Sequence, residues 1–182
     1  RLDSLQSART TYKKFLEIEP GNVETIHALA NLNFQLKNYQ EVVELETKVL
    51  ELNSQDSDAV ANLALAYDFL GEKEKAMTTY EQAIQDSPDD KDLVFNLARL
   101  HYVNGDYDKA VALFQKVIAI DPEDFDSNLN VGNAYLQMAD EYRKSLVKRE
   151  EANEKVGQED LDKLIEYYRQ SIPYMEKASE KK

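Results

Sequence analysis

Residues 105–122 read GDYDKAVALFQKVIAIDP, and residues 71–88 read GEKEKAMTTYEQAIQDSP. Glycine, alanine, an aromatic residue and proline recur in register in these two stretches, 34 residues apart. The match continues in both directions without drift, and the repeating blocks begin at Val23, Ser57, Lys91 and Phe125. A fixed period of this length is typical of a protein that stacks copies of one small structural unit.

Each block contains two runs of about 13 residues whose apolar positions recur every three or four residues, which predicts two amphipathic helices. Neither helix is stable alone, so the two must pack on each other. A small residue at Ala76 or Ala110 lets the two backbones approach closely, and the rings of Tyr67, Tyr80 and Phe114 fill the space around that contact.

The blocks end and restart at fixed residues. Pro88 and Pro122 cannot continue a helix, and Asp90 and Asp124, two residues later, can cap the next one. The whole chain has only five glycines and four prolines, which favours helix throughout.

The second and third blocks share a pattern of small, aromatic and turn residues. These are Leu63, Ala64, Tyr67, Gly71, Ala76, Tyr80, Ala83 and Pro88 in the second block, and Leu97, Ala98, His101, Gly105, Ala110, Phe114, Val117 and Pro122 in the third. The pattern resembles the tetratricopeptide repeat, a helix-turn-helix unit of 34 residues. The resemblance implies an all-α fold, a right-handed α-solenoid in which the first helices of the repeats line a concave groove.

We therefore expect one solenoid over residues 1–182. It would comprise the second helix of a truncated repeat at 1–22, repeats at 23–56, 57–90 and 91–124, and a last repeat at 125–182. The first full repeat departs from the pattern, because Asn33 and Glu46 stand where the other blocks place aromatic residues.

The last repeat contains an insertion at about 140–166. The insertion holds no proline and a single glycine, and its apolar residues continue the helical stripe, which predicts a helical hairpin with its tip near Gly157. The hairpin either binds a partner or covers the otherwise exposed face of the last repeat.

Composition limits the classes of partner. The chain has 182 residues, of which 42% are hydrophobic and 31% charged, and its net charge is -13. All of that imbalance lies between Pro20 and Ala139, with 21 acidic and 8 basic residues, whereas the two ends together hold 14 of each. Because nucleic-acid binders usually carry a basic stripe, we expect a protein or peptide partner of neutral to basic character and no nucleic acid.

The sequence leaves the compartment open. It has no cysteine, no run long enough to span a membrane and no apolar leader, but it begins at Arg1 and not at methionine. Both the cytoplasm and, after removal of a signal, the periplasm remain compatible with it.

The resemblance implies that groove-lining residues are those of each first helix that do not pack against the second. The candidates for peptide binding are the polar residues Asn31, Asn62, Asn96, Asn130 and Asn133, the apolar residues Phe34, Leu65, Phe69, Phe95 and Tyr102, and the charged residues Asp58, Asp92 and Arg99. The apolar candidates either anchor a ligand or are covered by the repeats themselves. The acidic residues either attract a basic ligand or simply suit a helix N-terminus.

Asn62, Asn96 and Asn130 occupy the same place in three successive blocks, although asparagine is a poor helix former. A carboxamide offers a donor and an acceptor, which matches one peptide group of an extended chain. The arrangement resembles the asparagine ladder by which some tetratricopeptide grooves hold a ligand's backbone. Copying of the repeats explains the same pattern.

Another binding mode of this family is a clamp of lysines, an arginine and asparagines around an acidic C-terminal tail. Here His27 replaces the first lysine, and Asp92 and Asn96 stand where the third block should supply lysine and arginine. We therefore do not expect this chain to bind an anionic tail in that manner.

The sequence contains no arrangement of residues typical of catalysis. The two histidines lie in different blocks, and no metal-binding cluster, phosphate loop or catalytic triad is recognisable. We expect no enzymatic activity, no cofactor and no metal. The chain is interpreted as a peptide-binding module, alternatively as a scaffold that self-assembles into a homo-oligomer through its block edges and hairpin, or as an accessory domain of a longer enzyme.

Overall fold

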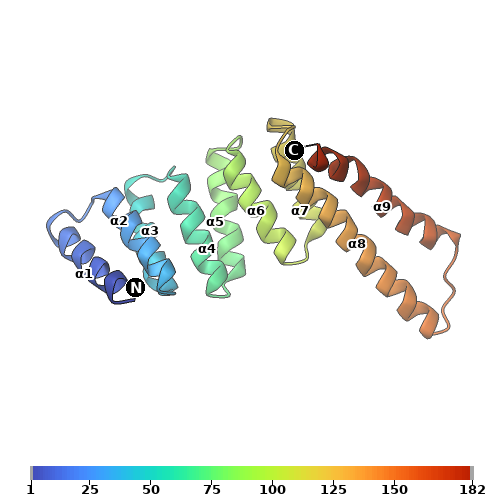
Figure 1. Cartoon of the computed structure of the whole chain (residues 1–182), viewed down its shortest axis with the longest axis horizontal. Coiled ribbons are helices and arrows are strands. Elements are labelled where there is room, and N and C mark those ends of the chain that lie inside the picture. Colours follow the sequence, from blue (N-terminus) through green and yellow to red (C-terminus); the bar gives the residue numbers. More distant parts are fainter. Residues whose placement is uncertain (1, 181–182) are drawn as a thin grey trace. The chain divides into compact units, whose positions relative to one another are not determined.

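The computed structural model describes residues 2–180, and within that range the chain forms α-helices and no β-strand. Figure 1 shows the helices in chain order. They are α1 (Leu2–Ile18), α2 (Val23–Gln35), α3 (Tyr39–Leu52), α4 (Ser57–Phe69), α5 (Lys73–Asp86), α6 (Lys91–Val103), α7 (Tyr107–Ile120), α8 (Phe125–Glu151) and α9 (Gln158–Ser179). The predicted all-α fold of paired helices is confirmed.

The helices α2, α4, α6 and α8 begin at the four residues where the period of the sequence starts its blocks. Side-chain caps fix these starts. The carboxylate of Asp90 accepts a hydrogen bond from the backbone N–H of Leu93 (3.2 Å), and that of Asp124 accepts one from Ser127 (2.7 Å). Both predicted caps are therefore confirmed, while the division of the chain into repeats stays a prediction.

The chain forms two compact units, Arg1–Leu93 and Val94–Lys182. In the first unit, each helix from α1 to α5 packs against its neighbour in the chain (Figure 1). The core lies where α2, α3 and α4 meet, and its buried residues include Ile26, Leu29, Ala30, Val42, Val49 and Leu63. Ala76 on α5 is completely buried, as expected for a small residue at a close helix contact.

The core of the second unit joins α6, α7 and α8. It consists of Ala98, Ala110, Val111, Phe114, Val131 and Ala134. Ala110 and Phe114 are completely buried, and the rings of Phe114 and Phe95 meet edge to face with centroids 5.4 Å apart. The sequence predicts a close contact between helices at Ala110. The space around that contact is filled by an aromatic side chain from the next turn of the same helix.

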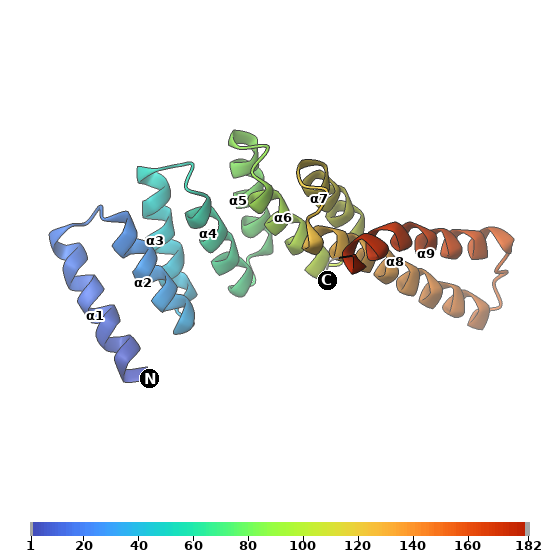
Figure 2. The same ribbon diagram turned by 45° about the horizontal axis from the view of Figure 1, so that its top comes forward.

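The predicted helical hairpin is formed by α8 and α9, which lie side by side in Figures 1 and 2. Near its tip, Asp160 accepts hydrogen bonds from Arg149 (2.7 Å), the backbone N–H of Gly157 (2.9 Å) and the hydroxyl of Tyr142 (2.9 Å). These donors, Arg149 first among them, lower the pKa of Asp160 to about 2. The carboxylate therefore stays charged and ties the start of α9 to α8.

Candidate interaction surface

Four of the predicted site residues lie on one face of α4. Asp58, Asn62, Leu65 and Phe69 follow one another at intervals of four, three and four residues, which places them in one row along a helix. Asp58 is exposed at the start of the row, and Phe69 is 57% exposed at its end.

Helix α2 runs alongside α4 in the same direction. At the start of both helices, Nε2 of His27 lies 3.5 Å from a carboxylate oxygen of Asp56, the N-cap of α4. At their ends, the rings of Phe34 and Phe69 meet with centroids 6.3 Å apart. Asn31, which is exposed, lies between these two contacts on α2. We call this surface of α2 and α4 the α2–α4 face.

One end of the α2–α4 face carries a cluster of three aromatic rings. Tyr39, at the start of α3, stacks on Phe69 with the two centroids 4.7 Å apart, and the rings of Phe34 and Tyr39 meet edge to face with centroids 5.8 Å apart. Phe34 and Tyr39 are partly buried against the core, whereas Phe69 stays exposed. The sequence predicted Phe34 and Phe69 but missed Tyr39, because Tyr39 belongs to a second helix.

A buried glutamate lies beneath the same face. Glu46 on α3 is completely buried and accepts a hydrogen bond from the amide nitrogen of Asn62 (2.8 Å). Its second oxygen lies 3.0 Å from Nδ1 of His27. Burial raises the pKa of Glu46, and the contacts with Asn62 and His27 oppose that rise without cancelling it.

Glu46 therefore links α2, α3 and α4 through polar contacts. The sequence marked it only as a departure from an aromatic position, with no sign of its partners. One of the two N–H groups of the Asn62 amide is thus engaged inside the unit.

The other unusual residue of this block, Asn33, is also buried and paired. Its side-chain oxygen accepts a hydrogen bond from Nε of Arg9 on α1 (3.0 Å). Arg9 also pairs with Glu41 on α3, to which Lys13 adds a second ion pair at 2.5 Å. Burial acts to raise the pKa of Glu41, but Lys13 and Arg9 together outweigh it and lower that pKa.

In the second unit, the predicted apolar residues contribute to the core. Phe95 packs on Phe114, and Tyr102 contacts Tyr107 with centroids 5.5 Å apart. These contacts favour the interpretation that Phe95 and Tyr102 are structural. Their half-buried state leaves only part of each ring open to solvent.

The predicted polar residues of the second unit lie on α6 and α8. Arg99 is exposed, and Asn96, Asn130 and Asn133 are half-buried. The amide nitrogen of Asn130 donates to the backbone oxygen of Asp126 one turn earlier (2.8 Å). Asp92, the remaining candidate, is exposed on the first turn of α6 and belongs to the first unit.

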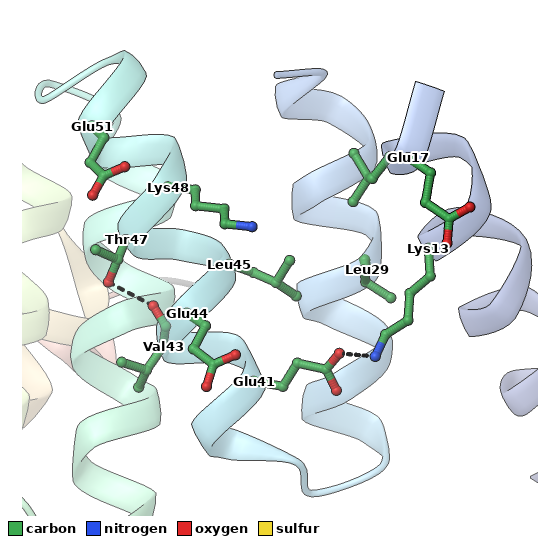
Figure 3. Close-up of a pocket in the computed structure, with 11 residues that line it drawn as sticks. Lys13, Glu17, Leu29, Glu41, Val43, Glu44, Leu45, Thr47, Lys48 and Glu51 are labelled. Carbon is green, nitrogen blue, oxygen red and sulfur yellow. Dashed lines mark hydrogen bonds and ion pairs between the residues drawn. The ribbon is translucent and has the colours of Figure 1, made fainter. Parts of the chain in front are cut away.

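A cleft of about 630 Å³, which the sequence does not predict, lies between α1 and α3. Figure 3 shows charged side chains at its rim, with Lys13 reaching Glu41 across it, and Leu29 and Leu45 at its base. The residues that line the cleft come from α1, α2 and α3. The repeat pattern does not distinguish them from other surface residues of these helices.

Metal-binding clusters and membrane-spanning helices are absent from residues 2–180. No cluster of histidine and acidic side chains in this range is arranged to hold a metal ion. None of the helices in the same range has the length and apolar character needed to cross a bilayer.

Residues 61–125 match a family model described as tetratricopeptide repeat. These residues, about a third of the chain, are similar to tetratricopeptide repeats. A curated relative, tetratricopeptide repeat protein 8 of Caenorhabditis elegans, is 34% identical over 85 residues, which are 47% of this chain and 17% of the relative. The chain thus matches less than a fifth of that protein's length.

Solved structures share the fold of this chain. The crystal structure of MamA matches with a TM-score of 0.66 and 23% identity, covering 97% of this chain and 91% of MamA. YrrB, described as a TPR protein with an unusual peptide-binding site, matches with a TM-score of 0.57 and 21% identity, covering 96% of this chain and 84% of YrrB. At these identities the similarity is one of fold, and the repeats of this family are typically protein-interaction modules without catalytic activity.

Proposed function

We propose that this protein is a non-catalytic interaction module that holds an extended, neutral to basic polypeptide segment on the α2–α4 face. One observation carries the proposal. Phe69 is 57% exposed although it is stacked on Tyr39 and contacted by Phe34, so a rigid aromatic surface is open at the end of a polar row.

Rigid aromatic side chains are frequent anchors in protein interfaces because they bury a large area at a small entropic cost. The ring of Phe69 is already held by its neighbours, so binding would immobilise little that is mobile. We therefore assign the cluster of Phe34, Tyr39 and Phe69 the role of anchor for an apolar side chain of the ligand.

The rest of the row suits the backbone and charge of such a ligand. Asn31 and the carbonyl oxygen of Asn62 lie in reach of an extended chain, and exposed Asp58 favours a basic residue near the start of α4. The surplus of acidic residues between Pro20 and Ala139 acts in the same direction. Leu65 provides an apolar contact between Asn62 and Phe69 on the same row.

We propose corresponding contacts for the second unit, with Asn96, Arg99, Asn130 and Asn133 as polar partners. The known description of YrrB as a peptide-binding TPR protein agrees with this type of function. Phe95 and Tyr102 would contribute only the edges that the core leaves open.

The test uses a display library of random peptides selected on the immobilised 182-residue chain. We expect the selected peptides to carry basic and large apolar residues. The Phe69→Ala variant should bind them at least about tenfold more weakly in fluorescence anisotropy, because it removes the anchor.

The matched control is Val103→Ala, an exposed apolar residue at the same offset in the next block. That variant should bind as the wild type does. Asn31→Ala offers a second test, since Asn31 is exposed, whereas replacing Asn62 would also disturb buried Glu46. Selection of no peptides, or equal binding by wild type and Phe69→Ala, contradicts the proposal.

A further inference from the structure

A row of apolar side chains on α9 faces solvent. Leu161, Ile165, Tyr168 and Ile172 follow one another at intervals of four, three and four residues, so they form one stripe along the helix. Each of the four residues is between 41% and 51% exposed. We call them the α9 stripe.

The spacing of the α9 stripe is that of a coiled-coil seam, in which apolar residues alternate at intervals of three and four. Single exposed apolar residues are common on protein surfaces, but a continuous row of four on one helix marks a contact surface. The buried side of α9, which includes Ser171 and Ala178, already packs against α8. The stripe is therefore a second apolar face of the same helix.

The other arm of the hairpin, α8, also exposes an apolar side chain. Val147 is 45% exposed. Beside the stripe on α9 itself, Asp162 and Arg169 are exposed and charged. The hairpin thus presents an apolar stripe with a charged border.

We propose that the α9 stripe is a self-association surface, on which the α9 stripe of a second copy of this chain packs in antiparallel orientation. Charge supports a second copy as the occupant. Residues 140–182 hold 11 acidic and 10 basic residues, a net charge of -1 out of -13 for the whole chain. Two copies can therefore meet at the hairpin without the repulsion that their acidic segments would impose elsewhere.

The register of the stripe is complementary to itself in the antiparallel orientation. Leu161 then faces Ile172 of the second copy, and Ile165 faces Tyr168 of the second copy. In each layer, a residue from the N-terminal half of one stripe contacts a residue from the C-terminal half of the other. All four side chains of each copy are therefore covered.

The charges beside the stripe fix this orientation. Asp162 and Arg169 lie along the same edge of the stripe and carry opposite charges, so an antiparallel pair brings each near its counterpart in the second copy. In a parallel pair the same edge would face Leu164 and Ser171, which offer no charge. Within one copy, Gln158 donates a hydrogen bond to Asp162, and Arg169 donates one to Glu166. Both contacts are exposed, so replacing them by contacts with the second copy costs little free energy.

The first experiment is sedimentation velocity of the wild-type chain over a concentration range of about 1 to 100 µM. We expect a reversible monomer–dimer equilibrium. Ile165→Asp should raise the dissociation constant of the dimer at least about tenfold, because it places a charge in the apolar seam. Circular dichroism of the same variant checks that its helix content is unchanged.

The matched control is Ile120→Asp, because Ile120 is 45% exposed at the end of α7 in the same unit and lies outside the stripe. This variant should dimerise as the wild type does. A wild-type chain that stays monomeric over the whole range overturns the proposal. So does a dimer that Ile165→Asp leaves intact or that Ile120→Asp weakens equally.

The orientation can be tested because the chain has no cysteine. In an antiparallel dimer, position 161 of one copy lies near position 172 of the other, and the two copies of position 161 are about 16 Å apart from the helical rise alone. A short bismaleimide should therefore cross-link a mixture of the Leu161→Cys and Ile172→Cys variants and neither variant alone. Cross-linking of Leu161→Cys with itself overturns the antiparallel arrangement.

Discussion

At the scale of single residues, the block that departs most from the repeat pattern carries its own set of polar contacts. Asn33 and Glu46 replace aromatic residues, and both are buried. Each is held by a partner from another helix, Arg9 for Asn33 and His27 for Glu46. The departures are therefore compensated substitutions, in which buried polar groups replace ring packing.

Glu46 makes the stability of the first unit depend on pH. Its pKa is raised in the folded state, so the stability that its protonated form contributes is complete below the unfolded value of about 4.5 and is lost as pH rises through the folded value. We expect Glu46→Gln, which keeps the shape of the side chain and an acceptor for Asn62, to be the more stable protein at pH 7. The expected difference in the free energy of unfolding is on the order of 1 kcal/mol.

The measurement is urea denaturation of both proteins between pH 4 and pH 8, within the range in which a raised glutamate pKa acts. The difference between the free energies of unfolding of the two proteins should grow with pH and then level off. Glu44→Gln, an exposed glutamate on the same helix, serves as control and should follow the wild type. Parallel pH profiles for wild type and Glu46→Gln would mean that Glu46 titrates as an ordinary surface acid.

At the scale of helices and turns, the sequence predicted where most elements begin. The period placed the starts of α2, α4, α6 and α8, and Asp90 and Asp124 provided a chemical reason for two of them. The hairpin of α8 and α9 was predicted because its apolar stripe continues through the insertion.

The sequence could not predict contacts that depend on side chains from other helices. Tyr39 and Glu46 lie on α3, a second helix, which the repeat pattern assigns to packing alone. The partner of Tyr39 is Phe69 on α4 and that of Glu46 is His27 on α2, and only the fold brings these residues near. The same limit applies to the cleft between α1 and α3.

The turn between α2 and α3 contains a strained residue. Lys37 has a φ of 62°, whereas Gly71 and Gly105 occupy the equivalent turns with φ of 79° and 83°. A side chain is unfavourable in this left-handed region, so Lys37→Gly should stabilise the chain by about 1 kcal/mol. Urea denaturation measures the change.

The reciprocal variant is Gly71→Lys, at a site where an added Cβ would meet no atom within 4 Å. The loss of stability in this variant therefore comes from the backbone. It should be similar in size to the gain in Lys37→Gly and opposite in sign. A Lys37→Gly variant that is no more stable than the wild type would show that the side chain of Lys37 compensates for its conformation.

At the scale of the whole molecule, the core is divided between two compact units. One cluster joins α2, α3 and α4, and another joins α6, α7 and α8. In a protein built of repeats, stability is set mainly by interactions within a repeat and with its nearest neighbours. A defect placed in one cluster should therefore act first on the unit that contains it.

Ala110→Leu tests this expectation. Ala110 is completely buried in the second cluster, so the larger side chain should cost about 1 to 3 kcal/mol by overpacking. Hydrogen exchange followed by mass spectrometry should show faster exchange in peptides from Val94 onwards, while peptides covering α2, α3 and α4 keep their wild-type protection. Ala76→Leu, at the equivalent buried position of α5, should produce the converse pattern. Equal acceleration across both units by either variant would indicate that the two clusters unfold as one, because only full cooperativity spreads a local defect over the whole chain.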